Sequence, residues 1–209
     1  MVDIPLQEII TAHTDALEAN YEGFLPLIRL LQLVGEGASV SPEQLATATH
    51  LTSEEIEAFL QSTDLVADRG GSIDLSPGPH LVHLEKKTLT VACALDALLF
   101  PMLIGRSARV VSTCPATEKE IRLTVTPERI EDVDPTSTVL SLLLPGETTS
   151  ACNARETICA YGHFFADRAH ASTWPGLHSE AVLLSVEDAA HLARELASAA
   201  RRYMEKAEC

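Results

Sequence analysis

The stretch VACALDALLFPMLIG, residues 91–105, joins the end of a predicted strand to a long apolar helix. Cys93 stands at the junction, and Asp96 follows three residues later, on the same face of the predicted helix. A leucine would fit the oily surroundings of Asp96, whereas a carboxylate there is costly unless it is paired or used. The stretch therefore predicts a strand-to-helix junction that carries chemistry as well as packing.

The residues after this junction alternate between strand and helix patterns. Residues 80–92 predict a strand pair, and further strands are expected at 109–114, 120–125, 138–144 and 180–186. Residues 158–167 are short and apolar, a strand or a loop. A long helix is expected from Ser185 to about Lys206, acidic at its start and basic near its end, as the helix dipole prefers. We therefore predict a mixed α/β core over residues 81–209.

The residues before the junction predict a small helical module. Residues 3–34 indicate two helices, broken near Gly23 and Pro26. Capping boxes at Ser41 and Thr52 then start two short helices, and residues 65–75 predict a hairpin that turns on Gly70–Gly71. This is a winged helix-turn-helix pattern over residues 1–80, with SPGPH (76–80) as the linker. The fold class is therefore α+β.

Charge argues against DNA as a partner of this module. Its second short helix carries Glu54, Glu55 and Glu57 and lacks Lys and Arg. The whole chain of 209 residues has 30 acidic and 15 basic residues, a net charge of −15. Nucleic acids and anionic membranes bind basic surfaces, so neither is expected as a partner.

Location and redox state follow from equally simple features. Apolar runs stay below the roughly 18 residues that a membrane span needs, and the N-terminus lacks the pattern of a signal peptide. Five cysteines are an odd number, and they include no CxxC pair. These features predict a cytoplasmic protein without a disulfide framework or a structural zinc site.

Each cysteine can be interpreted either as a packing residue or as a reactive thiol. A helix N-terminus stabilises a thiolate, which suits Cys93, although free cysteines often only fill space in a core. Cys159 is unremarkable by itself, and Cys114, before a proline, is expected in the core. Cys152 and Cys209 are expected to be exposed or terminal. Spacing alone leaves open whether Cys93 and Cys159 meet.

CALDALLFPMLIGRSARVVSTC (93–114), followed by CAYGHFFA (159–166), resembles the bacterial organomercurial (alkylmercury) lyases. The resemblance extends over nearly the whole chain, including a winged-helix-like N-terminal domain that does not act on DNA. It implies that Cys93 and Cys159 are the mercury-handling thiols, Asp96 the catalytic carboxylate and Cys114 a structural cysteine. Ala92 and Ala160 depart from residues that relatives can carry, an aromatic and a second cysteine, and bear on pocket shape.

The residue types suit that chemistry. Thiolates are the soft ligands that a soft metal such as mercury prefers. Two of them weaken the carbon–mercury bond, and a positioned acid then protonates the carbon, a contribution of about 10²–10⁴-fold. Apolar neighbours such as Leu95, Leu98 and Leu99 are expected to raise the pKa of Asp96 toward neutrality.

The expected reaction converts R–Hg⁺ to R–H and Hg²⁺, which stays on Cys93 and Cys159 near Asp96. It requires no cofactor, and Hg²⁺ is the bound product. Low-molecular-weight thiols would bring the substrate, and the resemblance implies hand-over of Hg²⁺ to a mercuric reductase. Two alternatives remain, a thiol-based metal-responsive winged-helix regulator and a non-catalytic protein that sequesters soft metals.

Overall fold

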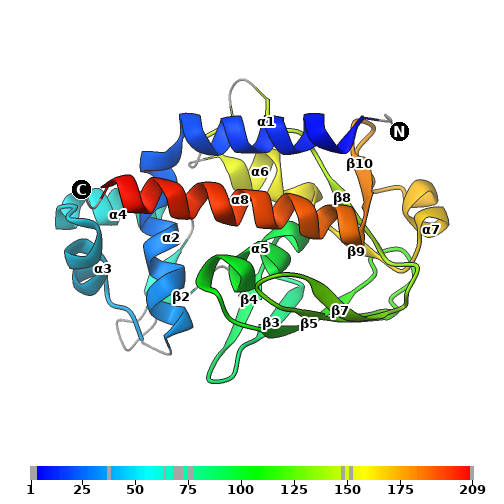
Figure 1. Cartoon of the computed structure of the whole chain (residues 1–209), viewed down its shortest axis with the longest axis horizontal. Coiled ribbons are helices and arrows are strands. Elements are labelled where there is room, and N and C mark those ends of the chain that lie inside the picture. Colours follow the sequence, from blue (N-terminus) through cyan, green and yellow to red (C-terminus); the bar gives the residue numbers. More distant parts are fainter. Residues whose placement is uncertain are drawn as a thin grey trace.

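The computed structural model (Figure 1) describes residues 4–36, 39–63, 65–67, 73–74, 78–146, 149–150 and 153–207. Two long helices lie side by side along one face of the molecule, α1 (Leu6–Ala19) and α8 (Val186–Ala207). Small residues of α8, among them Ala189, Ala193 and Ala197, are fully buried. Their size lets the neighbouring helices pack closely on α8. The predicted C-terminal helix is thus confirmed.

Helix α5 (Ala94–Ile104) lies between α8 and the main sheet (Figure 1). It is apolar on all sides, and most of its residues are buried, as a helix without a polar face must be. Gly105 ends it in the left-handed conformation, with φ of 67°. The segment quoted from the sequence is therefore the central helix of the core, as predicted.

The main sheet is antiparallel, in the order β4–β3–β5–β6–β7. Its strands are β3 (His80–His83), β4 (Thr88–Val91), β5 (Ala108–Thr113), β6 (Glu120–Val125) and β7 (Ile130–Asp134). Cys114 lies one residue beyond β5 and is buried. The sequence predicted four of these strands and missed β7, whose residues are half-buried or exposed at the sheet edge.

A second antiparallel sheet has the order β10–β8–β9. It contains β8 (Val139–Leu142), β9 (Phe164–Phe165) and β10 (Val182–Ser185), and α7 (Arg168–Thr173) packs beside it. The ambiguous segment 158–167 resolves into a 3-10 helix over Cys159–Tyr161 and strand β9. Just before it lies the short helix α6 (Ala154–Thr157).

The break between the first two helices differs from the prediction. Helix α2 (Tyr21–Gly35) contains both Gly23 and Pro26, and the break falls at Asn20. Asn20 accepts the backbone N–H of Gly23 and donates its side-chain amide to the carbonyl of Ala16, which marks the helix boundary. Burial of the apolar face after Pro26 outweighs the lost hydrogen bond of the proline.

The two capped helices are confirmed. They are α3 (Pro42–Thr49) and α4 (Ser53–Ser62), and both carry complete capping boxes. Strands β1 (Val66–Ala67) and β2 (Ile73–Asp74) pair in an antiparallel manner, while the Gly70–Gly71 turn and Ser76–Pro77 of the expected linker lie outside the described residues. Among the helices described, none combines the length and the apolar character that a bilayer crossing needs.

Candidate functional site

The first site residue, Cys93, caps the N-terminus of α5. Its backbone is extended, and its carbonyl accepts the N–H of Ala97 at 3.2 Å, the first bond of the helix. The side chain of Cys93 is only 2% exposed. The strand-to-helix junction thus fixes this thiol in the core, next to the positive end of the helix dipole.

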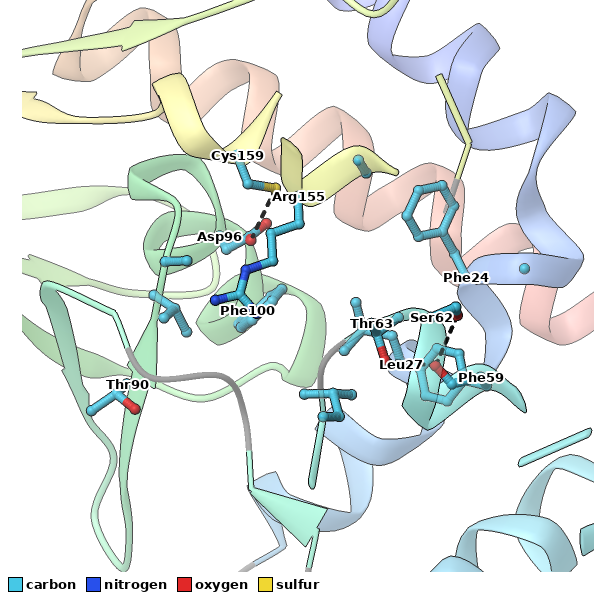
Figure 2. A pocket seen from close by; sticks show the side chains of 15 residues that line it. Phe24, Leu27, Phe59, Ser62, Thr63, Thr90, Asp96, Phe100, Arg155 and Cys159 are labelled. Carbon is cyan, nitrogen blue, oxygen red and sulfur yellow. Dashed lines mark hydrogen bonds between the residues drawn. The ribbon is translucent and has the colours of Figure 1, made fainter. Parts of the chain in front are cut away.

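Asp96 and Cys159 complete a cluster with Cys93. One ligand atom from each of the three side chains lies within 4.8 Å of the other two. The Cys159 thiol donates to Oδ2 of Asp96 at 3.9 Å, the dashed line between these two side chains in Figure 2. The structure therefore brings together all three residues predicted for the site.

Gly162 makes the approach of the second cysteine possible. Its carbonyl accepts the N–H of Ala94 at 2.9 Å, which ties the turn after Cys159 to the start of α5. A Cβ atom at Gly162 would lie 2.5 Å from Sγ of Cys93, closer than real contacts allow. Only glycine therefore lets this turn lie directly over the Cys93 thiol.

Ser141 of β8 anchors the same turn from the other side. Its hydroxyl, fully buried, donates to the carbonyl of Tyr161 at 2.7 Å and accepts the N–H of His163 at 3.2 Å. The N–H of Ser141 also donates to the carbonyl of His163. In the sequence, position 141 indicates only a residue of an apolar strand, so the hydrogen bonds from Ser141 to this turn were not predicted.

Burial sets the protonation of the cluster. It raises the pKa of Asp96 to about 7, and the hydrogen bond from Cys159 lowers this pKa by a smaller amount. The side chain keeps some accessibility because it lines two cavities, yet protein surrounds it. The hydrogen bond with Cys93, burial and the charge of Asp96 all raise the pKa of Cys159, and the charge of Arg155 lowers it. Asp96 thus titrates in the range where an acid is useful at neutral pH.

Two cavities of about 140 Å³ each meet at this cluster. The first, the α8 chamber, lies among α1, α2, α5 and α8, and its lining includes Ala16, Leu17, Leu99, Leu196 and Cys93. The second, the α4 chamber, lies among α2, α4, β4 and α6, and its lining includes Phe59, Thr90, Ala92 and Arg155 (Figure 2). Both chambers share the residues Phe24, Leu27, Asp96, Phe100, Ala154 and Cys159.

The remaining cysteines are not part of the cluster. Cys114 is fully buried; burial opposes ionisation, but hydrogen bonds from the Thr117 hydroxyl and from backbone N–H groups leave the pKa of its thiol lowered. Its place in the core fits a structural role. Cys152 and Cys209 lie outside the described residues.

A buried histidine behind the site was also missed in the sequence. His80 is 1% exposed, and its Nδ1 lies 2.7 Å from the hydroxyl of Ser112. Burial lowers the pKa of His80 to about 4, so the ring is neutral at physiological pH. Its edge packs against Phe164, just beyond the Gly162 turn. His80 therefore supports the turn as a neutral core residue.

A family model and curated relatives show similarity between this chain and alkylmercury lyases, and a solved structure has a similar fold. The family model described as MerB, alkylmercury lyase, matches residues 74–198. An alkylmercury lyase of Staphylococcus epidermidis is 38% identical over 173 residues, 80% of this chain and 79% of the relative. One from Bacillus cereus is 38% identical over 202 residues, 90% of this chain and 89% of the relative. The crystal structure of the mercury-bound form of MerB2 has the same fold, with a TM-score of 0.71 at 20% identity over 93% of this chain and 99% of that one.

Proposed function

The chain belongs to the alkylmercury lyase family, and we propose that it cleaves the carbon–mercury bond of organomercury cations, R–Hg⁺, to give R–H and Hg²⁺. The observation that carries the proposal is the cluster of Cys93, Asp96 and Cys159, with ligand atoms within 4.8 Å of one another. It joins two soft ligands for mercury to one proton carrier.

Substrate capture begins at Cys159. This thiol is half-buried and lines both chambers, whereas Cys93 is 2% exposed. A carrier complex R–Hg–SR′ exchanges its thiolate for Cys159, forming the bond from Cys159 sulfur to mercury and releasing R′SH with the cysteine proton. Low-molecular-weight thiols are therefore the proposed carriers.

Cleavage follows when Cys93 joins the metal. Its thiol proton passes to the carboxylate of Asp96, and mercury then carries two thiolates and R. The carboxyl gives that proton to the carbon, the carbon–mercury bond breaks, and R–H leaves. Hg²⁺ remains on Cys93 and Cys159 near Asp96. A carboxyl that titrates near pH 7 suits both steps, because it accepts and releases a proton at neutral pH.

The scheme balances without a cofactor. R–Hg–SR′ and two cysteine thiols give R–H, R′SH and the mercury dithiolate, and two further R′SH molecules carry Hg²⁺ away. A mercuric reductase is the proposed recipient. The reducing cytoplasm is the proposed compartment, because the chemistry needs free thiols, as Cys93 and Cys159 are here.

The N-terminal module, residues 1–80, is proposed to complete the site rather than to bind DNA. Phe59 and Ser62, from α4 and its end, line the α4 chamber, while α1 and α2 line the α8 chamber. Glu54, Glu55 and Glu57 of α4 are exposed, which suits neither phosphates nor the major groove. The catalytic module would be residues 81–209.

The test measures the hydrocarbon. Purified protein is incubated with methylmercury or phenylmercury chloride and excess thiol, and methane or benzene is followed by gas chromatography. We expect catalytic release from the wild-type chain and none from a chain with both Cys93→Ser and Cys159→Ser. Hydrocarbon no greater than in a heat-killed control would refute lyase activity.

A further inference from the structure

Resting on the proposed function, we propose that the two chambers take opposite halves of the carrier complex R–Hg–SR′. The organic group R enters the α8 chamber, and a small anionic thiol occupies the α4 chamber. Mercury then lies where the chambers meet, at Asp96 and Cys159, which line both. The specificity for R is therefore set by α1, α2, α5 and α8.

Most polar groups that line the α8 chamber are engaged within the protein; the exception is Nε2 of His13, which is buried without a hydrogen-bond partner among the described residues. Asn20 donates to the carbonyls of Ala16 and Thr149, at 2.9 and 3.2 Å. The Thr149 hydroxyl accepts the N–H of Gly146, and Nδ1 of His13 is bonded to the carbonyl of Ile9. Apart from the reacting cluster and Nε2 of His13, the lining of the chamber is mainly hydrocarbon, which favours an apolar R.

The size of the α8 chamber limits R further. Its volume is about 140 Å³, close to the roughly 150 Å³ of an apolar protein cavity that binds benzene. A phenyl group or a short alkyl chain therefore fits without displacing the walls. A fused two-ring group fills the chamber more tightly than a phenyl group does, so we expect it to be the poorer substrate.

The α4 chamber differs from the α8 chamber in having one positively charged side chain in its lining. Arg155 supplies the one guanidinium or ammonium group among the described residues that line either chamber. In Figure 2 its side chain extends past Asp96 toward Phe100. A guanidinium favours a carboxylate, so a thiol that carries a carboxylate suits this chamber better than a neutral one.

The positions of Cys93 and Arg155 determine which way round the carrier complex R–Hg–SR′ binds. Cys93 lines the α8 chamber only, and Arg155 lines the α4 chamber only. Mercury(II) with two ligands holds them on opposite sides. When the carrier thiol points toward Arg155, R therefore points toward the α8 chamber, where Cys93 can reach the metal.

Two matched substitutions test the division. Ala16→Leu adds three carbon atoms to the α8 chamber, and Ala92→Leu adds the same three to the α4 chamber. The measured quantity is kcat/KM for phenylmercury divided by kcat/KM for methylmercury, with one thiol throughout. We expect Ala16→Leu to lower this ratio by about tenfold or more, and Ala92→Leu to leave it within about twofold. The reverse pattern, or equal effects, overturns the proposal.

A third variant covers the case in which Ala16→Leu fails to fold. Leu99→Ala enlarges the α8 chamber, so it is expected to raise the rate for naphthylmercury relative to phenylmercury. An unchanged preference would contradict the assignment of R to this chamber. Because each result is a ratio within one protein, a general loss of activity cancels.

The carrier is tested at Arg155. The rate with mercaptoacetate is divided by the rate with 2-mercaptoethanol for the wild type and for Arg155→Gln. Loss of the guanidinium is expected to lower this ratio by about fivefold, as for a partly exposed ion pair. An identical ratio in both proteins overturns the anionic-thiol assignment.

Binding separates this proposal from the lyase function. In an Asp96→Asn background, which retains both thiols, the relative affinity for phenylmercury and methylmercury is measured without cleavage. Ala16→Leu should lower it while Ala92→Leu does not. If the wild type released no hydrocarbon, lyase activity would fail, yet this affinity ratio would still decide where R lies.

Discussion

The two cysteines of the site lie in regions of opposite character. Cys93 caps a helix that is apolar on all sides and mostly buried, between α8 and the main sheet. Cys159 lies in a single 3-10 turn without a fully buried residue, between the short helix α6 and the two-residue strand β9. One thiol is fixed by the core, and the other is presented by a turn that a few hydrogen bonds hold.

This difference suits a two-thiol reaction. In the proposed mechanism, the half-buried thiol of Cys159 exchanges with a carrier, and the buried thiol of Cys93 beside the carboxyl then completes the reaction away from water. The cost is that the distance between the two sulfur atoms depends on the contacts of the turn at Gly162 and Ser141. Substitutions in each region therefore separate the contribution of the helix from that of the turn.

The largest effect is expected from removing either thiol. Cys93→Ser and Cys159→Ser should each abolish turnover, because a hydroxyl cannot replace a soft ligand of mercury. Turnover is measured as hydrocarbon release. Cys152→Ser and Cys209→Ser serve as controls and should retain nearly full activity. Full activity of the Cys159 variant would show that the turn carries no mercury ligand.

Asp96→Asn should have the next largest effect. The amide keeps the size and polarity of the side chain but cannot donate a carboxylic proton, so single-turnover cleavage should fall by about 10²-fold or more. Both thiols remain, and the ultraviolet band of the mercury–thiolate complex should persist.

If Asp96 had only a structural role, the result would differ. The asparagine variant would then be less stable, yet each folded molecule, counted by thiol titration, would cleave at nearly the normal rate. A rate within about threefold of the wild type would leave Asp96 without the role of general acid.

Gly162→Ala tests the approach of the two regions. The new methyl group would lie 2.5 Å from Sγ of Cys93, so the turn that carries Cys159 must shift. We expect kcat/KM to fall by about tenfold, with a loss of stability of about 1–3 kcal/mol. Gly146→Ala is the matched control, because its methyl group would be 4.0 Å from the nearest atom, Oγ1 of Thr149. Equal effects of both substitutions would show that the close approach is unimportant.

The last effect is on stability rather than on turnover, and it depends on pH. Burial raises the pKa of Asp96 to about 7, above the value of about 3.9 in an unfolded chain. Between about pH 4 and 7 the folded protein therefore holds a proton that the unfolded chain has lost, and its free energy of unfolding falls by about 1.4 kcal/mol per pH unit. Below this window the contribution is fully present, and above it the slope vanishes.

Asp96→Asn isolates this contribution. Urea unfolding of the metal-free proteins, wild type and variant, gives the difference in free energy of unfolding at each pH. The stability of the wild type relative to the variant should decline from pH 4 to pH 7 and then level off. A difference that is constant over this range would mean that Asp96 has an ordinary pKa in the folded protein.

The sequence predicted most elements where the signal is local. Both capping boxes lie where expected, and the apolar helix after Cys93 and the long C-terminal helix were correctly placed. Strand β7 was missed because Ile130–Asp134, rich in acidic residues, forms a sheet edge and buries no clear face. The helix break was misplaced because glycine and proline weaken a helix locally, whereas the packing of α2 decides the outcome.

For the site, the sequence by itself determined the kinds of atoms available. It supplied two thiols and a carboxylate whose apolar neighbours predicted a raised pKa, and the resemblance of its motifs assigned their roles. The tertiary structure alone decided that Cys159 meets a helix start 63 residues earlier, through Gly162 and Ser141. It also decided that two chambers meet there. The physical reason is that a cap or an apolar face depends on neighbours a few residues away, whereas distances between remote segments depend on the packing of the whole core.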